Sequence, residues 1–296
     1  MIDEDIFVGN KKTLRYLNRT LEKGCVSHAY IFEGPEHVGK MTLALLFASE
    51  LLGDSYENVR KNPDLLLITA EEEKSEIEVD AIRELQKNLS LYPFKSAYKA
   101  AVIERAELMN RTAANALLKT LEEPGKTSVL ILVSSDMSRL LPTIRSRCQI
   151  LNLNTAAQGA LERHLSARGA GSDIPDILEL SEGKTGMAIM LAEDRELLQS
   201  VKDSSKKILE FFDYNNFQKM EAAAAISLMD KKEAAKILDQ WTSTLRRELL
   251  SALSAGKKER IAKLESALVK TMSVKEDILN NNVSLKLAIE NLCLGF

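Results

Sequence analysis

A glycine-rich segment near the N-terminus carries the residue types that bind a phosphate group. Residues 34–40 read GPEHVGK, with glycine at Gly34 and Gly39 and a lysine at Lys40. In such a loop the glycines let backbone N–H groups turn toward phosphate oxygens, and the lysine reaches the terminal phosphates of a nucleotide. The segment therefore predicts a P-loop that follows a strand and opens a helix.

The residue after the lysine departs from a working P-loop. That position normally holds Ser or Thr, whose hydroxyl binds the magnesium ion between the phosphates, but here it is Met41. Thr42 follows, and one helical step turns its side chain by about 100° from the required direction. We predict a vestigial nucleotide-binding set of Gly34, Gly39, Lys40 and Thr42. Two alternatives stay open: the loop persists only because it packs well, or it holds ATP or ADP without hydrolysis.

The second catalytic element of an ATPase is also altered. A pair of acidic residues normally follows the third strand, where one carboxylate holds the metal and the next polarises the attacking water. Here the apolar run ends in Glu104 and Arg105. Glu104 keeps an oxygen ligand, but arginine cannot act as a base. This degenerate pair, together with Met41, predicts that the chain does not hydrolyse ATP by itself.

The first half of the sequence alternates between strand and helix patterns. Short apolar runs predict strands, and apolar residues at three- and four-residue spacing predict helices. Alternation of this kind indicates a parallel sheet covered by helices on both faces. The expected strands span residues 29–32, 65–68, 100–103 and 129–133, and the expected helices span residues 11–23, 40–52, 79–89 and 113–121.

After Ile150 the pattern is helical. Residues 157–203 indicate short helices broken near Gly169–Gly171 and Gly183–Gly186. Longer helices follow, and one carries an apolar stripe typical of core packing rather than of a ligand site. We predict an α/β domain over residues 1–155, a small helical domain over 156–204 and an all-helical domain over 205–296. The stripe consists of Ala234, Ile237, Leu238, Trp241, Leu245 and Leu249.

Composition narrows the class of protein. The chain has 296 residues, a formal charge of −3 and a pI near 5.8, which argues against a free-standing DNA binder. Cys25, Cys148 and Cys293 lie far apart without metal-ligand spacing, so we expect neither a disulfide nor a metal site. No apolar run approaches the roughly 20 residues that cross a bilayer. We expect a cytoplasmic protein without a membrane partner.

Two further segments closely resemble a known family. Residues 113–124 read AANALLKTLEEP, and Ser146, Arg147 and Cys148 form an SRC element shortly afterwards. Both resemble signatures of the clamp-loader subunits of bacterial DNA polymerase III, which are AAA+ proteins. Matching pieces at residues 27–30 (SHAY) and 62–64 (NPD) extend the resemblance along most of the chain. It implies an AAA+ P-loop domain, then a helical lid, then a helical collar that oligomerises.

The resemblance also implies a role for each motif. Decay of the phosphate site together with a retained SRC element points to the delta-prime branch of the family. In these subunits the SRC arginine, here Arg147, is an arginine finger that acts in trans on ATP bound to the neighbouring subunit. Arg145 is a weaker candidate for the same interface. The implied partners are the tau/gamma motor subunits, the delta subunit, and the sliding clamp and primed DNA, within the DNA polymerase III holoenzyme.

The sequence departs from the family pattern at two places. Many delta-prime proteins carry four zinc-binding cysteines after the P-loop helix, but residues 52–62 contain no cysteine, so we expect no zinc. Motor subunits have a lid arginine that contacts the nucleotide, and Gly186 stands at that place. The glycine at the lid position is a third loss from the ATP site and argues against tight nucleotide binding.

Two other classes of function remain as alternatives. An active P-loop enzyme, such as a nucleotide kinase or a self-sufficient motor ATPase, predicts turnover by the isolated chain and magnesium-dependent nucleotide binding. A DNA-binding adaptor that acts alone predicts salt-sensitive binding by the purified chain. Met41 and Arg105 argue against the first alternative, and the acidic balance of the chain argues against the second.

Overall fold

The computed structural model describes residues 1–2, 7–69, 76–212, 214–280 and 283–296. The chain divides into two compact units, Met1–Glu193 and Asp194–Phe296. The predicted boundary between residues 155 and 156 lies between a strand and a helix of the first unit. The predicted boundary between residues 204 and 205 lies within a single helix of the second unit, so the three-domain division stays a prediction.

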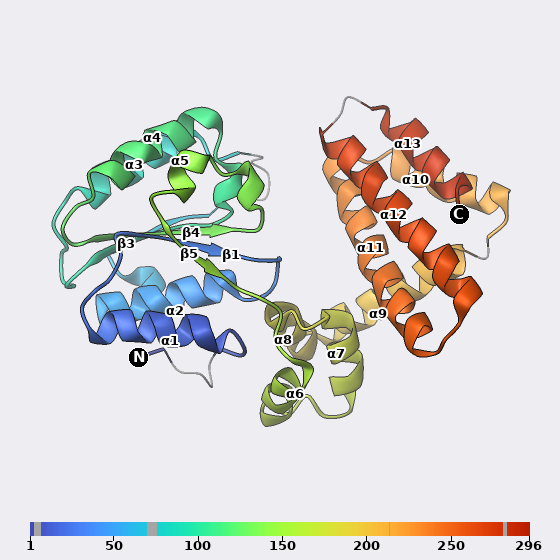
Figure 1. The fold of residues 1–296 in the computed structure, drawn as a ribbon, viewed down its shortest axis with the longest axis horizontal. Helices are drawn as coiled ribbons and strands as arrows, with labels where there is room; N and C mark the ends of the chain where they lie inside the picture. The colour runs from blue at the N-terminus through green and yellow to red at the C-terminus, as the bar shows by residue number, and fades with distance from the viewer. Residues whose placement is uncertain (3–6, 70–75, 213, 281–282) are drawn as a thin grey trace. The chain divides into compact units, whose positions relative to one another are not determined.

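The described residues of the first unit contain a parallel five-stranded sheet (Figure 1). The order of its strands is β2-β3-β4-β1-β5, and each neighbouring pair is parallel. The prediction placed four of these strands correctly to within one residue at each end. The strands are β1 (Ala29–Glu33), β2 (Leu65–Ile68), β3 (Lys99–Ile103), β4 (Ser128–Ser134) and β5 (Gln149–Asn152).

Strand β5 was not predicted, and the expectation that no strand extends beyond Ile150 was wrong, because β5 ends at Asn152. Three of its four residues are exposed and only Leu151 is buried, so it lacks the continuous apolar run of the other strands. The strand lies at the edge of the sheet, where one side needs no partner strand. Pairing with β1, for example Ile31 beside Ile150, places it there.

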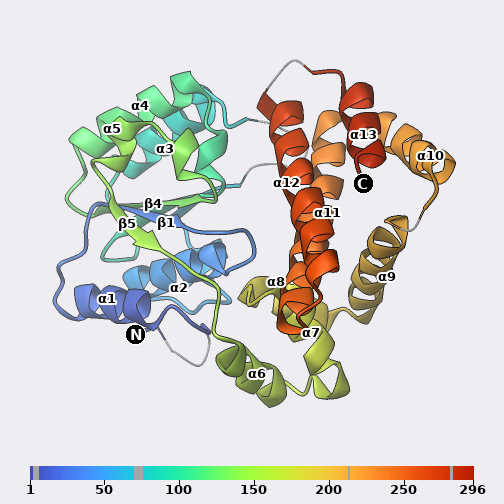
Figure 2. The ribbon, with the colours of Figure 1, turned by 45° about the vertical axis from the view of Figure 1, so that its right-hand side comes forward.

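Helices cover both faces of the sheet (Figure 1 and Figure 2). On one face α1 (Lys11–Glu22) and α2 (Lys40–Leu52) pack against β1 and its neighbours around Tyr30, Phe32 and Phe47. The other face is covered by α3 (Val79–Leu89), α4 (Arg111–Glu122) and the short α5 (Pro142–Arg145). Short 3₁₀ turns connect these elements at η1 (Val59–Lys61), η2 (Ala106–Leu108) and η3 (Met137–Arg139).

The first unit ends in a small group of helices. These are α6 (Gln158–Ala167), the turn η4 (Gly171–Asp173), α7 (Ile174–Ser181) and α8 (Thr185–Glu193). The glycine-rich breaks lie where the pattern indicated them, except that Gly186 belongs to the first turn of α8. Backbone hydrogen bonds tie this group to the sheet domain, for example from the Ala156 N–H to the Gly183 carbonyl at 2.8 Å.

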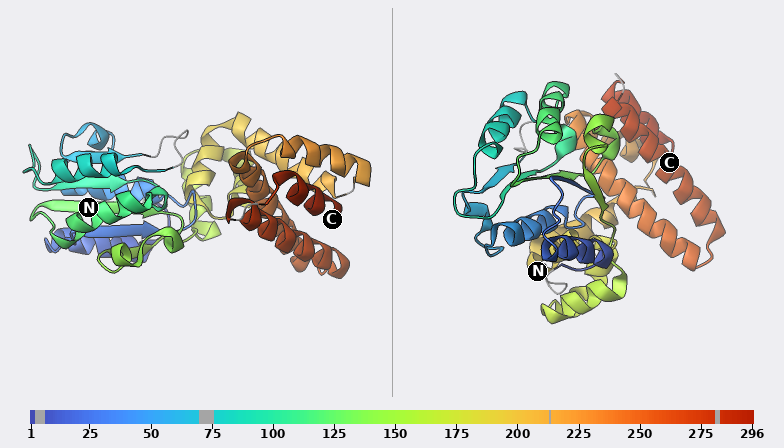
Figure 3. Two further views of the ribbon diagram at one scale, coloured as in Figure 1. Left: turned by 90° about the horizontal axis from the view of Figure 1, so that it is seen from above. Right: turned by 60° about the vertical axis from the view of Figure 1, so that its left-hand side comes forward.

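The second unit is helical throughout its described residues. Helices α11 and α12 lie side by side as a long antiparallel pair (Figure 1 and Figure 3). The predicted apolar stripe is core: Ala234, Leu238, Trp241 and Leu245 are buried. No described helix of either unit is both long and apolar enough to span a membrane. The helices are α9 (Arg195–Phe211), α10 (Asn216–Ser227), α11 (Lys231–Ser254), α12 (Lys258–Asn280) and α13 (Leu285–Leu294).

Candidate functional site

The predicted P-loop connects β1 to α2 at the carboxyl edge of the sheet, where open α/β sheets bind ligands. Strand β1 lies between β4 and β5, and the Gly34 N–H donates to the Ser134 carbonyl at the end of β4. Gly34 needs to be glycine because an added Cβ would overlap the carbonyl oxygen of Leu153. Gly39, with φ of 92°, begins α2 in the left-handed region that glycine adopts easily.

Lys40 is directed into the loop itself. It is only 7% exposed, and its Nζ donates to the carbonyls of Gly34 at 2.6 Å and Pro35 at 2.7 Å and to Ser135 Oγ at 3.0 Å. An ammonium group has three N–H donors, and these three contacts engage all of them. Burial lowers the pKa of Lys40, and the negative charge of Glu107 opposes that shift. A phosphate could engage Lys40 only by displacing contacts that the chain already makes.

Met41 and Thr42 provide no clear replacement for the magnesium-binding hydroxyl. The Met41 side chain is half-buried and packs against the hydrophobic core beneath α2. Thr42 is half-buried on the next step of the helix. Because Lys40 is engaged internally and a thioether follows it, this donor set does not fit a magnesium–nucleotide complex.

The degenerate acidic pair follows β3. The Glu104 N–H donates to the Ile68 carbonyl at 2.8 Å, which continues the pairing with β2. Arg105 is exposed and adopts a left-handed conformation, with φ of 52°, at the start of η2. Its guanidinium carries a fixed positive charge, so Arg105 cannot act as a catalytic base.

Sequence reasoning missed the polar residues that complete this site. Glu107, on η2, accepts from the Ser135 N–H through Oε1 at 3.3 Å, and its Oε2 is buried without a hydrogen-bond partner among the described residues. Its charge acts on Lys40. No local pattern indicated Glu107, because η2 begins only at Ala106, after Arg105 has reversed the chain in a left-handed conformation. The chain thus supplies its own anion near the P-loop lysine.

The lid helices contact the P-loop directly. The Gly186 N–H at the start of α8 donates to the His37 carbonyl at 2.7 Å. A Cβ at Gly186 would lie 2.8 Å from that carbonyl oxygen, closer than side chains tolerate. Glycine at the predicted site of the lid arginine therefore lets the lid backbone approach the P-loop.

Arg147 lies at the surface, just after α5. Its Nη2 donates to Glu122 Oε1 at 2.9 Å, and its Nη1 donates to the Thr143 carbonyl at 3.1 Å. The side chains of Arg147 and Glu122 are 36% and 52% exposed. Within the described residues no hydrogen bond or ion pair joins Arg147 to residues 34–40 of its own chain. The structure thus connects the SRC element with the LEEP end of α4, but not with the P-loop.

The side chains beside Arg147 make contacts within their own chain. Ser146 Oγ donates to the Thr143 carbonyl at 3.1 Å, which completes the last turn of α5. Arg145 Nη1 donates to the Met137 carbonyl at 3.4 Å in a half-buried setting. Cys148 packs against the core below α3 and α4, where burial raises the pKa of its thiol to about 12. Cys148 is therefore a protonated apolar filler at neutral pH.

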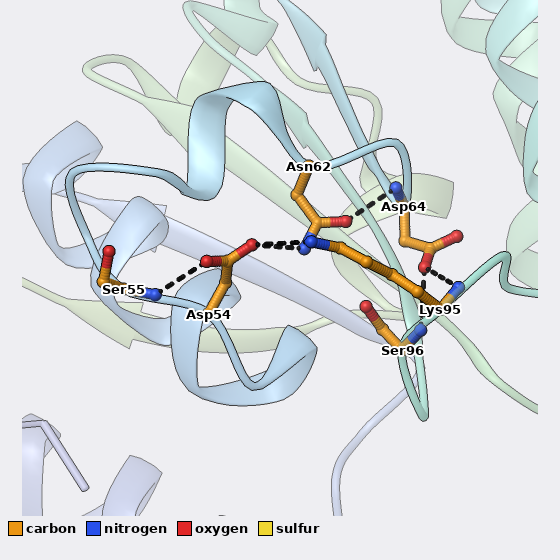
Figure 4. Close-up of polar contacts among 6 residues, drawn as sticks. All are labelled: Asp54, Ser55, Asn62, Asp64, Lys95 and Ser96. Atoms are coloured by element: carbon orange, nitrogen blue, oxygen red, sulfur yellow. Dashed lines mark hydrogen bonds and ion pairs between the residues drawn. The ribbon is translucent and has the colours of Figure 1, made fainter.

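The NPD segment holds a buried polar network (Figure 4). Asp64 is fully buried, and its carboxylate accepts the backbone N–H of Phe94 at 2.5 Å. It also accepts the backbone N–H groups of Lys95 and Ser96, each at 2.9 Å. Burial raises the pKa of Asp64, but these hydrogen bonds outweigh it and hold the pKa below its usual range. Asn62 accepts the Asp64 N–H at 2.9 Å. This segment fixes the loop that leads into β3.

Asp54 extends the same network toward the surface. Its carboxylate accepts from Asn62 Nδ2 at 2.8 Å and from Lys95 Nζ at 3.2 Å. These hydrogen bonds lower the pKa of Asp54, the one from Asn62 most strongly. Among the described residues no group of three or more His, Cys, Asp or Glu side chains is arranged to hold a metal ion.

Comparison with known proteins places the chain in a family. Residues 9–157 match the family model described as DNA polymerase III, delta subunit, which covers just over half of the chain. The chain belongs to this family. Membership confirms the resemblance inferred from the AANALLKTLEEP and SRC segments.

Members of this family from two bacteria are similar in sequence. The chain is 31% identical over 202 residues to the DNA polymerase III subunit delta' of Bacillus subtilis, covering 64% of this chain and 61% of that protein. It is 36% identical over 204 residues to the subunit delta' of Pseudomonas aeruginosa, covering 62% of each chain. The match thus spans about three fifths of the length of these curated relatives.

A solved structure is similar in fold. A DNA polymerase III gamma subunit-related protein from Thermotoga maritima matches with a TM-score of 0.55 and 22% identity, covering 95% of this chain and 97% of the other. Together with the parallel strand order, this confirms the predicted fold of a parallel α/β domain followed by helical regions.

Proposed function

We propose that this chain is a delta-prime-type clamp-loader subunit that does not hydrolyse ATP and that donates Arg147 to the ATP site of a neighbouring motor subunit. The observation that carries the proposal is the contrast between a P-loop lysine engaged by its own chain and an SRC arginine held at the surface. The activity belongs to the assembled loader, which places a sliding clamp on primed DNA.

The setting of Arg147 suits a residue that acts on a partner. Its ion pair with Glu122 is exposed, and exposed pairs contribute about 0–1 kcal/mol, so the arginine can leave at small cost. Its planar guanidinium presents paired N–H donors that match phosphate oxygens. Arginine fingers raise phosphoryl-transfer rates by about 10³ to 10⁵ in other systems. A shift from Glu122 to a neighbouring γ-phosphate would thus exchange a weak contact for a strong one.

The P-loop setting supports a site that does not turn over. Lys40 is bound to loop carbonyls, Met41 faces the core and Gly186 closes against His37. Any ATP or ADP held there would be bound weakly and without hydrolysis. Glu104 and Arg105 would then be relics of the acidic pair, and no zinc would be needed.

The partners follow from this role. They are the tau/gamma motor subunits, the delta subunit and, through the assembled complex, the sliding clamp and primed DNA. Residues 205–296 would form the collar through which the subunits associate. Such an assembly belongs to the cytoplasmic DNA polymerase III holoenzyme.

ATP hydrolysis by the reconstituted loader tests the proposal. Turnover stimulated by clamp and primed DNA is measured with Arg147→Ala or Lys40→Ala in this subunit alone, after gel filtration has shown that assembly is retained. Arg147→Ala is expected to lower turnover sharply, and Lys40→Ala to change it little. Arg83→Ala is the matched control, because Arg83 also makes an exposed ion pair, with Asp80. A silent Arg147→Ala with an inactive Lys40→Ala would mean that the loop is a working site.

A further inference from the structure

The second unit contains a cavity of about 1010 Å³ for which the proposed collar role names no occupant. Residues near the end of α9, the start of α12 and the end of the chain line it. Its apolar lining includes Leu209, Phe212, Leu264 and Phe296, of which Leu264 is buried and the others are half-buried. We call it the α9–α12 pocket. Its volume is at the upper end of the roughly 300–1,000 Å³ typical of ligand pockets.

The rim of the α9–α12 pocket is positively charged. Lys257, Lys258 and Lys263 line it and are exposed, and in the described part of the chain none of them makes an ion pair. Arg260 also lines it, but its guanidinium is paired with Glu248 at 2.7 Å. Glu259 is the acidic residue among the lining side chains. The three lysines therefore leave an excess of positive charge around an apolar interior.

We propose that the α9–α12 pocket docks a short acidic segment of a partner protein that also carries bulky apolar side chains. Aspartate or glutamate residues of the segment pair with Lys257, Lys258 and Lys263, while leucine or phenylalanine side chains enter the apolar interior. The pocket is complementary to such a segment in both charge and polarity. The excess positive charge favours an acidic partner, and covering the half-buried apolar lining removes apolar surface from water.

The same lysines suit a nucleic acid less well. Single-strand binders combine a basic groove that tracks the backbone with aromatic faces on which bases stack. Here the Phe212 and Phe296 rings contact each other, with centroids 5.1 Å apart, and Phe296 also meets Phe211 edge to face. These rings are engaged within the unit rather than offered as a platform. The chain as a whole also carries a net charge of −3, which disfavours a nucleic acid as the occupant.

Fluorescence anisotropy with the full chain tests the docking site. The probe is a fluorescein-labelled peptide of about twelve residues in which aspartates alternate with leucine and phenylalanine. Binding in the micromolar range is expected at physiological ionic strength, where interactions between distant surface charges are screened. The double variant Lys258→Glu/Lys263→Glu is expected to weaken binding at least about tenfold. The matched control, Lys232→Glu/Lys236→Glu on α11, makes the same charge change at exposed positions outside the pocket and is expected to bind normally.

Two competitor probes decide the chemistry of the occupant. A peptide with the same aspartates but serine in place of leucine and phenylalanine is expected to bind at least about tenfold more weakly. An oligothymidylate of equal charge is expected to compete poorly. Equal binding of the serine peptide, efficient competition by the oligonucleotide, or absence of peptide binding would overturn the proposal. None of these results depends on Arg147, so the proposed function is tested separately.

Discussion

Two basic residues of the first unit, Lys40 and Arg147, come from motifs that act on phosphate, and their surroundings differ completely. Lys40 is buried, and its three donors are used by two loop carbonyls and Ser135. Arg147 is at the surface and its ionic partner is an exposed glutamate. Moving Lys40 away would leave buried hydrogen-bond acceptors of the loop without a donor, which costs free energy. Arg147 can leave Glu122 with a small loss of free energy, because their ion pair is exposed. A charged side chain can interact with a partner protein when its contacts within its own chain are weak, as those of Arg147 are and those of Lys40 are not.

Replacing Arg147 by lysine is the strongest way to test this contrast. Arg147→Lys keeps the positive charge but loses the planar fork that binds two oxygens at once. We expect the lysine variant to lose about 10³-fold or more in hydrolysis at the neighbouring ATP site, nearly as much as Arg147→Ala. Single-turnover hydrolysis by the reconstituted loader measures this rate. Wild-type rates in the lysine variant would show that charge alone is sufficient, and so contradict a fork-dependent finger.

A substitution in the P-loop tests whether the loop is a structural element. Gly34→Ala places a Cβ against the Leu153 carbonyl, at a φ of 152° that disfavours side chains. We expect a loss of about 3 kcal/mol in the free energy of unfolding, measured with urea. Gly53→Ala is the matched control, because Gly53 has φ of 63° but open space around it. Its expected loss is about 1 kcal/mol, and equal losses in the two variants would contradict the role of the Leu153 contact.

Like Lys40, Asp64 is a buried charged residue whose hydrogen-bond partners all belong to its own chain. Its pKa is below the usual value of about 3.9, so its stabilising contribution is complete above that value and is lost as pH falls through the folded-state pKa. Asp64→Asn should cost about 2 kcal/mol at pH 7, because an amide has one acceptor oxygen for three N–H donors. In this variant the free energy of unfolding, measured with urea, should also fall less steeply than in the wild type as the pH is lowered from about 5 to about 2.

An exposed aspartate controls for this effect. Asp80 makes an exposed ion pair with Arg83, and Asp80→Asn should change stability by less than about 0.5 kcal/mol. An unchanged acid limb in Asp64→Asn would show that other carboxylates dominate the acid response.

The smallest expected effect is that of the ion partner of Arg147. Glu122→Gln removes the exposed ion pair and should alter the free energy of unfolding by less than about 1 kcal/mol. Turnover of the reconstituted loader should remain within about twofold of wild type, because the finger acts after leaving Glu122. A large fall in turnover with unchanged assembly would mean that Glu122 positions Arg147 during catalysis.

Regular apolar patterns made most of the sheet domain predictable. Strands β1, β3 and β4 are largely apolar runs because both of their faces are covered. The edge strand β2 was predictable because all four of its residues, Leu65–Ile68, are apolar, although only Leu65 is buried. Strand β5 escaped prediction because polar residues, Gln149 and Asn152, flank its two apolar residues and three of its four residues are exposed. The P-loop and the SRC element were likewise recognisable, since each is a contiguous motif.

The sequence by itself determined the family, the alternating order of the first four strands and their helices, and the replacements at Met41 and Arg105, because these depend on residue type and local spacing. Only the tertiary structure brought Glu107, Ser135 and the Gly186 backbone to the P-loop. These groups come from separate elements, and local patterns carry no information about which of them meet at a sheet edge. The hydrogen bonds and the electrostatic environment of Lys40 depend on how these elements come together, because a buried charge is stabilised by the polar groups that the fold places around it.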